Sequence, residues 1–175
     1  LKSKGYNIRL PDLSFLKKEI RLLRQTADYF KKLLKILQPK VAFVTDYYSD
    51  IGMAFVLACK ELKITSVDIQ HGVQGEYHRA YGRWNNVPKD GYELLPTIFW
   101  CRGEIEANAI KEWNQAVSKY HRPIIGRNLY LNQWLYGNNE LVYYYDQQIL
   151  AFKKDKPPIH ILYTLQDYII PEWVW

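Results

Sequence analysis

The chain has 175 residues, of which 48% are hydrophobic, 15% aromatic and 24% charged. This composition supports a buried core and excludes a disordered or fibrous protein, and the length suits one full domain. The formal net charge is +6, but residues 1–40 sum to +8 and the other 135 residues sum to −2. The basicity therefore belongs to one N-terminal segment, and the rest of the chain is close to neutral.

Residues 11–38 show the periodicity of an amphipathic helix, which Pro39 ends. The apolar stripe is Leu16, Ile20, Leu23, Ala27, Phe30, Leu34 and Leu37, and the opposite face carries Lys17, Lys18, Arg21, Arg24, Lys31, Lys32 and Lys35. Three heptads are compatible with a short coiled coil, but a long helix lying on a sheet gives the same stripe, and we favour the sheet. Because no exposed aromatic residues are expected between the basic ones, a nucleic-acid partner is disfavoured.

A β-α-β unit follows this helix. Residues 41–45 form a short apolar run that predicts a fully buried strand, and residues 65–69 predict a second strand. Between them, residues 51–62 predict a helix that Ser49 or Asp50 can cap, with small residues for close packing at Gly52, Ala54 and Ala58. A strand, a helix and a strand within about thirty residues predict a parallel sheet.

The rest of the chain continues this alternation. Residues 70–96 form a long irregular stretch, and such a stretch in a compact domain is usually functional. Strands are predicted at 97–101 and 123–125 and helices at 104–117, 129–136 and 140–152, so the fold class is α/β. The helix at 104–117 is expected to carry Ile105, Ala109 and Trp113 on one side. We expect one domain over residues 1–152, a linker at 153–158 and the start of a truncated second domain over 159–175, in a piece of a longer protein.

Several chemistries are disfavoured by what the sequence lacks. Cys59 and Cys101 form no CxxC pair, so neither a disulfide framework nor a zinc site is indicated, and a reducing, cytoplasmic setting is the default. No apolar run approaches the ~18 residues of a membrane span. The motifs of dinucleotide oxidoreductases, P-loop kinases, nucleophile-elbow hydrolases and zinc proteases are absent, as is an Asp-rich metal loop.

The residues that follow the strands are candidates for chemistry, because ligands bind beyond the carboxyl ends of parallel strands. His71 leads them, since an imidazole at this edge can accept a proton from a hydroxyl near neutral pH; the alternative is a histidine that pins the loop. Asp46 can hold a sugar hydroxyl, orient His71 or cap a helix. The binding candidates are Gln70, Gly72, Ser49, Tyr77, His78, Gly126 and Arg127.

Two groups of residues can be explained either by ligand binding or by a purely structural role. Gly126 allows close backbone approach beside Arg127, which can pair with a phosphate, or it makes only the turn into the next helix. The long loop carries Tyr77, Tyr81, Trp84 and Tyr92. Such aromatic residues suit sugar rings when they are exposed, and they form a small core when they pack under the loop. His121 and His160 lie where strands begin, so we expect them to be structural.

Several short motifs occur in a familiar order. They are Asp46-Tyr47-Tyr48-Ser49-Asp50, Ala58-Cys59-Lys60-Glu61-Leu62, Ser66-Val67-Asp68-Ile69 and Gln70-His71-Gly72, then Leu94-Leu95-Pro96, Phe99-Trp100, Pro123-Ile124-Ile125-Gly126 and residues 159–166. This order resembles bacterial glycosyltransferases of the two-domain GT-B type, which build capsule, lipopolysaccharide and other surface polysaccharides. The chain departs from the usual pattern at Thr97 and at Cys101-Arg102.

The resemblance implies two Rossmann-like domains, each a parallel sheet flanked by helices, with the acceptor on the N-terminal domain and the nucleotide-sugar donor on the C-terminal one. This chain would be the acceptor half, inactive by itself. His71 would be the base or the acceptor-orienting residue, with Asp46 and Gln70 beside it. The full enzyme would move a sugar from a nucleotide-sugar donor to a glycan or lipid-linked acceptor. GT-B enzymes need no bound metal, so no cofactor is expected.

Alternatives to this function stay open. A nucleotide-sugar epimerase has the same architecture, and a non-catalytic glycan-binding domain would use His71 structurally. In an enzyme of surface-glycan assembly, the basic helix at 12–37, with a net charge of +4, can rest on the anionic inner face of the membrane. The alternative is a solvated helix face. We therefore expect a cytoplasmic protein that is peripheral on the membrane if this helix binds it.

Overall fold

The computed structural model describes residues 12–72, 74–137 and 139–154. The strand expected at 159–163, most of the linker and the start of the second domain lie outside these residues, so the domain boundaries stay predictions. The chain divides into two compact units, residues 1–128 and 129–175. Each unit is described by itself.

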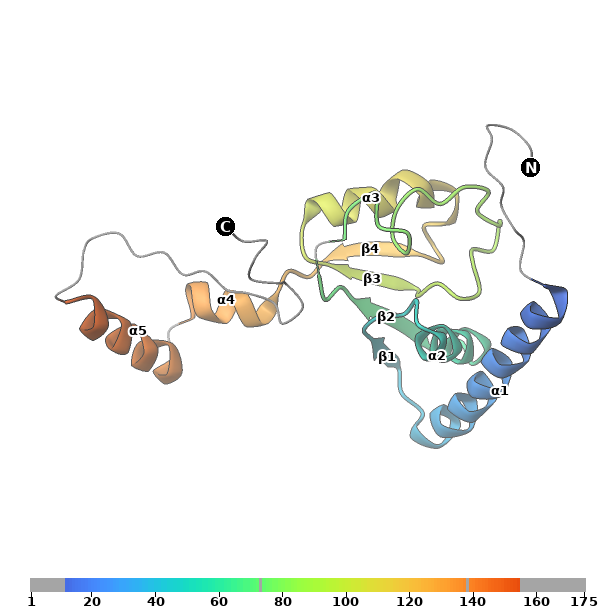
Figure 1. Cartoon of the computed structure of the whole chain (residues 1–175), viewed down its shortest axis with the longest axis horizontal. Coiled ribbons are helices and arrows are strands. Elements are labelled where there is room, and N and C mark those ends of the chain that lie inside the picture. The colour runs from blue at the N-terminus through green and yellow to red at the C-terminus, as the bar shows by residue number, and fades with distance from the viewer. Residues whose placement is uncertain (1–11, 73, 138, 155–175) are drawn as a thin grey trace. The chain divides into compact units, whose positions relative to one another are not determined.

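Unit 1 contains a four-stranded parallel sheet with the order β1-β2-β3-β4 (Figure 1). The strands are β1 (Val41–Val44), β2 (Thr65–Ile69), β3 (Ile98–Cys101) and β4 (Arg122–Ile125). Helix α2 (Asp50–Glu61) connects β1 to β2, and α3 (Glu104–Asn114), with the 3-10 turn η1 (Gln115–Val117), connects β3 to β4. An α/β fold with a parallel sheet flanked by helices is thus confirmed, and it is compatible with a Rossmann-like domain.

Helix α1 (Leu13–Leu37) begins at the N-cap Asp12 and ends at Gln38, whose φ of 47° is left-handed. It lies alongside α2 (Figure 1). Ala27 and Leu34 share a buried cluster with Ala54, Leu57, Ala58 and Cys59 of α2, and with Ala42 of β1. The helix is confirmed, but its main support is α2 and not the sheet, because the small side chains of α2 let the two helices approach closely.

The amino-terminal half of the expected apolar stripe on α1 is not buried. Leu16 and Ile20 are 38% and 57% exposed. Phe15 and Tyr29 are also exposed, at 54% and 66%. The expectation that no exposed aromatic side chains lie among the basic residues of this helix is therefore wrong. Of the stripe, only Leu23, Ala27, Phe30 and Leu34 pack in the cluster, and Leu37 is 63% exposed.

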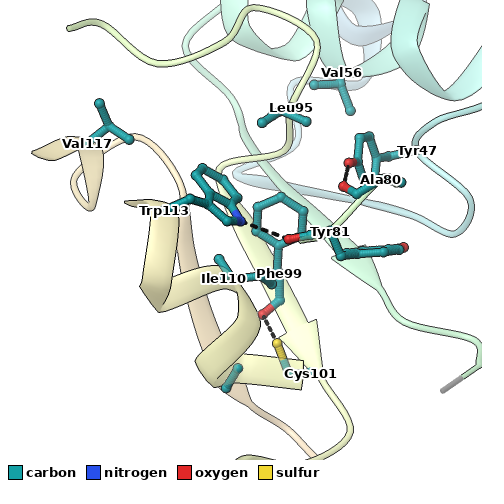
Figure 2. Packing of buried hydrophobic residues seen from close by; sticks show 11 residues of the cluster. Tyr47, Val56, Ala80, Tyr81, Leu95, Phe99, Cys101, Ile110, Trp113 and Val117 are labelled. Atoms are coloured by element: carbon teal, nitrogen blue, oxygen red, sulfur yellow. Dashed lines mark hydrogen bonds between the residues drawn. The ribbon is translucent and has the colours of Figure 1, made fainter. Parts of the chain in front are cut away.

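A second cluster fills the space between the sheet and the helices α2 and α3 (Figure 2). Phe99 of β3 is fully buried at its centre, with edge-on contacts to Tyr47, Tyr81 and Trp113 at centroid distances of 5.7, 5.9 and 6.1 Å. Trp113 of α3 donates a 2.8 Å hydrogen bond from its indole to the carbonyl of Tyr81 (Figure 2). Tyr81 belongs to the irregular stretch between β2 and β3, so this loop is part of the core.

The opposite face of the sheet is more open at β1. Ala42 is buried under the helices, whereas Val41 and Phe43 are 41% and 57% exposed, and Ile69 of β2 is 37% exposed. The strand at β1 was expected to be buried on both faces, and that expectation is wrong within the described residues. The physical reason is that the strands follow one another in sequential order. When the connections between neighbouring parallel strands all have the same handedness, they lie on the same face of the sheet.

Unit 2 is described as two helices, α4 (Leu129–Tyr136) and α5 (Glu140–Lys153), at the expected positions. The amide oxygen of Asn139 caps α5 by accepting a 2.9 Å hydrogen bond from Val142 N. Trp134 and Tyr145 meet edge-on at 5.6 Å between the helices. Within the described ranges, neither these helices nor those of unit 1 include one long and apolar enough to cross a membrane.

Candidate functional site

The chain turns sharply between β1 and α2. Asp46 has a φ of 61°, a left-handed conformation that aspartate tolerates better than most residues. The hydroxyl of Ser49 donates to the carbonyl of Asp46 and accepts from Gly52 N, which makes Ser49 the N-cap of α2. A Cβ on Gly52 would lie 2.5 Å from the Asp46 carbonyl, so this turn requires glycine. The cap is therefore Ser49, and Asp46 keeps its carboxylate for other contacts.

Tyr48 brings the two loop histidines of the predicted site together. Its ring centroid lies 6.4 Å from that of His71 and 5.5 Å from that of His78. His71 is exposed and forms no hydrogen bond to another described residue. His78 accepts a 3.3 Å hydrogen bond at Nδ1 from Ala80 N. In its neutral form His78 therefore carries its proton on Nε2 and can donate it to a ligand oxygen.

A pocket of about 680 Å³ lies between the start of α2 and the long loop. Tyr48 and Met53 form one wall, and the loop residues Tyr77, His78, Trp84 and Tyr92 form much of the other. Trp84 and Tyr92 contact each other at a centroid distance of 5.0 Å. Tyr77 is 75% exposed, and the Arg83 guanidinium carbon lies 4.0 Å from the centroid of the Tyr77 ring. Among the loop aromatics, Tyr81 is a core residue and the other three line the pocket.

Asp68 is a buried acid near Tyr48 that is not among the residues predicted from the sequence. It lies on β2 with no exposed surface. Its Oδ2 accepts a 2.8 Å hydrogen bond from the Tyr81 hydroxyl, and its Oδ1 accepts a 3.4 Å one from Tyr47 N. Burial raises the pKa of Asp68 to about 6, although these two hydrogen bonds and the nearby charge of His71 oppose the shift. A carboxylic acid inside a predicted buried strand was the signal available in the sequence.

Other groups at the carboxyl edge are buried without hydrogen-bond partners. Gln70 is 4% exposed, and neither its Nε2 nor its Oε1 has a partner among the described residues. Oε1 of Gln74, which is 3% exposed, and Oδ1 of Asp46 are in the same situation. An unpaired buried polar atom costs about 1–3 kcal/mol. These four atoms are therefore polar positions that the described residues leave unsatisfied, and none of the three residues lines the pocket.

Tyr48 is affected by the same carboxylates. Desolvation, and then the neighbouring Asp46 and Asp68 charges, raise the pKa of the Tyr48 phenol above its ordinary value. Tyr48 therefore stays neutral near physiological pH, with a hydroxyl that can both donate and accept. The site so combines two loop imidazoles and a neutral phenol with the carboxyl groups of Asp46 in the turn and of Asp68 on β2.

Gly126 and Arg127 lie against a different side chain. A Cβ on Gly126 would be 1.8 Å from the indole of Trp100, and that indole donates a 3.0 Å hydrogen bond to the Arg127 carbonyl. Arg127 itself has a φ of 59° and an exposed side chain. The glycine thus makes room for Trp100. At Gly72, by contrast, an added Cβ would meet nothing within 4 Å, so its side of the loop is open.

His121 is structural, as expected for a residue at the start of a strand. It is 2% exposed, its Nε2 accepts a 2.8 Å hydrogen bond from Tyr92 N, and its Nδ1 lies 2.9 Å from the Pro96 carbonyl. These contacts fit a neutral imidazole with its proton on Nδ1. Burial lowers the pKa of His121. The residue ties the end of the long loop to the start of β4.

In the described ranges, no group of three or more His, Cys, Asp or Glu side chains is arranged to hold a metal ion. Cys59 and Cys101 are free thiols with no exposed surface, and burial raises their pKa values to about 11 and about 12. Both are therefore protonated and unreactive near neutral pH.

Comparisons with known protein families, with curated proteins and with solved structures find no match to this chain.

Proposed function

We propose that this chain is the acceptor-binding part of a GT-B-type glycosyltransferase. The enzyme would transfer a sugar from a nucleotide-sugar donor to a glycan or lipid-linked acceptor during synthesis of a surface polysaccharide. The observation that carries the proposal is an aromatic-walled pocket lined by His78 and Tyr48, with His71 outside the lining but next to Tyr48, at a ring-centroid distance of 6.4 Å.

The pocket suits a sugar ring. Its volume of about 680 Å³ falls within the ~300–1,000 Å³ typical of small-molecule sites. Tyr77, Trp84 and Tyr92 present flat apolar faces with polar tips, which complement the C–H faces and hydroxyl edges of a sugar. Gln70 and Gln74 do not line the pocket, but they belong to the same long loop and carry buried amide atoms without partners among the described residues. Hydrogen bonds to sugar hydroxyls would satisfy them.

The two imidazoles have different tasks in this proposal. His71, with no hydrogen bond to the described residues, accepts the proton of the acceptor hydroxyl as that oxygen attacks the anomeric carbon. The bond from the anomeric carbon to the nucleoside diphosphate breaks in the same step, and the diphosphate leaves with the electron pair. His78 donates its Nε2 proton to an acceptor oxygen and holds the ring in place. Asp46, whose charge acts on Tyr48, would hold a sugar hydroxyl or orient His71.

The test compares two matched substitutions in the intact protein that contains this chain. Sugar transfer from a panel of radiolabelled nucleotide sugars to membrane-lipid and glycan acceptors is measured for the parent, for His71→Gln and for His78→Gln. Loss of a general base costs ~10²–10⁴-fold, so His71→Gln should fall by that factor. Glutamine still donates a hydrogen bond, so His78→Gln should keep most of its rate and show mainly a raised KM for the acceptor.

Other outcomes would replace the proposal. A rate unchanged in His71→Gln removes this residue from the chemistry. Inversion of a sugar in the nucleotide donor without any acceptor identifies an epimerase. Glycan binding that needs Tyr77 and Trp84, with no turnover of any nucleotide sugar, identifies a non-catalytic glycan-binding domain.

A further inference from the structure

Helix α1 carries a second apolar row, on a different side from the face that packs on α2. Phe15, Leu22, Tyr29 and Ile36 follow one another at intervals of seven residues, and Leu33 lies beside them. Their exposed fractions are 54%, 47%, 66% and 79%, and that of Leu33 is 39%. Seven residues make nearly two helical turns, so these side chains lie along one side of the helix.

This outward row is distinct from the face that packs on α2. The packed face consists of Leu23, Ala27, Phe30 and Leu34. At 100° per residue the two rows are centred roughly 115° apart around the helix. The outward row therefore adds nothing to the core of unit 1, and leaving this much apolar surface in water on one helix has a cost.

Basic side chains border the outward row. Lys18, Arg21 and Lys32 lie next to it on the helix, and Lys17, Arg24 and Lys35 continue the basic strip. The ion pairs that α1 forms within the described ranges are those of Lys31, with Asp28 at 2.7 Å and Glu61 at 2.6 Å. The basic residues beside the row are thus available to an anionic surface.

We propose that α1 binds an anionic lipid bilayer, with the outward row at the boundary of the acyl chains and the basic strip among the headgroups. An exposed apolar row flanked by lysine and arginine is the pattern of a helix that lies in a membrane interface. The charge argues for this occupant over a second copy of the chain. Pairing two copies through the row would bring two basic strips together, and like charges on facing helices repel.

The membrane proposal does not depend on sugar transfer, because it uses no residue of the pocket. The two can fail separately. If both hold, the helix keeps the aromatic pocket of the same unit near lipid-linked acceptors.

The experiment is co-sedimentation of the full chain with vesicles. Binding is expected to vesicles of phosphatidylglycerol and phosphatidylcholine, and to be lost on vesicles of phosphatidylcholine alone. Each basic residue near an anionic surface contributes about fivefold in affinity. The triple variant Lys18→Glu, Arg21→Glu and Lys32→Glu should therefore bind at least about a hundredfold more weakly. A matched control, Lys89→Glu, Lys111→Glu and Lys153→Glu, changes the net charge equally away from α1 and should bind within a few-fold of the parent.

A second variant separates insertion from simple charge attraction. Leu22→Ser with Ile36→Ser keeps every charge and touches only exposed side chains, so folding, checked by circular dichroism, should be unchanged. Binding to the anionic vesicles should fall at least tenfold. The proposal is overturned if this variant or the charge-reversal variant binds like the parent, or if the control triple loses as much. It is also overturned if the row instead mediates a dimer in sedimentation, or if duplex DNA binds α1 more tightly than the vesicles do.

Discussion

The hydroxyl of Tyr81 donates a 2.8 Å hydrogen bond to Oδ2 of Asp68, and neither side chain has exposed surface. Tyr81 comes from the long loop and Asp68 from the second strand. The same carboxyl group accepts from Tyr47 N in the turn after β1. One buried acid therefore connects the sheet to both segments that wall the pocket, and its ionisation affects the stability of that arrangement.

Asp68→Asn should change how stability depends on pH. The folded-state pKa of about 6 lies above the ordinary value of 3.8, so the native protein binds more protons than the unfolded chain between these values. Its free energy of unfolding therefore falls as the pH rises from about 4 to about 6, by about 3 kcal/mol from this group. Asparagine does not titrate, and its amide can accept from Tyr47 N and donate to the Tyr81 oxygen.

Urea unfolding of the parent and of Asp68→Asn at pH 4, 5, 6 and 7 measures this difference. The variant should gain stability relative to the parent as the pH rises. A constant difference over this range would show that Asp68 does not titrate abnormally.

Tyr81→Phe should destabilise the protein by about 1–3 kcal/mol, because it leaves Oδ2 of Asp68 buried without its donor. It should also raise the pKa of Asp68 further, since the lost hydrogen bond favoured the charged form. Tyr77→Phe is the matched control: this tyrosine is 75% exposed, so its change should stay within about 0.5 kcal/mol. Chemical denaturation at one pH compares the two variants. Equal effects would contradict the role of the buried pair.

His121 should make the stability of the protein depend on pH in the opposite direction. Its pKa is lowered by burial from 6.5, so the native protein binds fewer protons than the unfolded chain below that value. Stability contributed by the neutral imidazole is present above about pH 6.5 and is lost as the pH falls below it. His121→Gln keeps an acceptor for Tyr92 N and does not titrate, so this part of the acid sensitivity should disappear. Thermal unfolding at pH 7.5 and 5.5 checks it, and an undiminished loss in the variant would exclude His121 as the source.

Gly52→Ala should destabilise the protein by about 1–3 kcal/mol through overpacking, because the added methyl group would meet the Asp46 carbonyl at 2.5 Å and Tyr47 Cα at 2.8 Å. Both contacts are backbone atoms of the turn that carries Tyr48, so the pocket should distort as well. Gly75→Ala serves as the control, since nothing lies within 4 Å of its added atom. The melting temperatures of the two variants should separate clearly. Similar values would mean that the turn can relax around the methyl group.

The secondary structure was largely accessible from the sequence. Pro39 and the regular spacing of apolar residues predicted α1, and short apolar runs between polar residues predicted the four strands in order. The alternation of these elements then predicted the parallel sheet. Local signals of this kind are strong because the periodicity of each element is set by its own geometry.

What the sequence did not show depends on tertiary contacts. On α3, Ile105 was placed on one side with Ala109 and Trp113, which are buried, yet Ile105 is 76% exposed, while Glu106 beside it is 8% exposed. The packing of Ala107 and Ile110 in the core decides which side of this helix is buried. The spacing of apolar residues in its first turn does not show this. Likewise, Tyr81 and Trp84 both belong to the same aromatic loop, but only the fold decides that the first is core and the second lines the pocket.

The candidate site was predicted by topology more than by chemistry. Placing His71 and His78 after the second strand was enough to bring them near Tyr48. Asp68 was missed because the pattern of a strand predicts which face a side chain lies on. It does not predict the hydrogen-bond donors that make a buried acid tolerable. The catalytic roles assigned to His71 and Asp46, and the binding roles assigned to the other candidates, stay predictions.

The long loop has a consequence for ligand binding. Tyr81, with its carbonyl bonded to Trp113 and its hydroxyl to Asp68, fixes the middle of this loop in the core. The conformational entropy of ordering that wall is therefore lost during folding and not when a ligand arrives, which favours tight and rapid association with a preorganised pocket. It also means that denaturant should abolish ligand binding and core packing in a single cooperative transition.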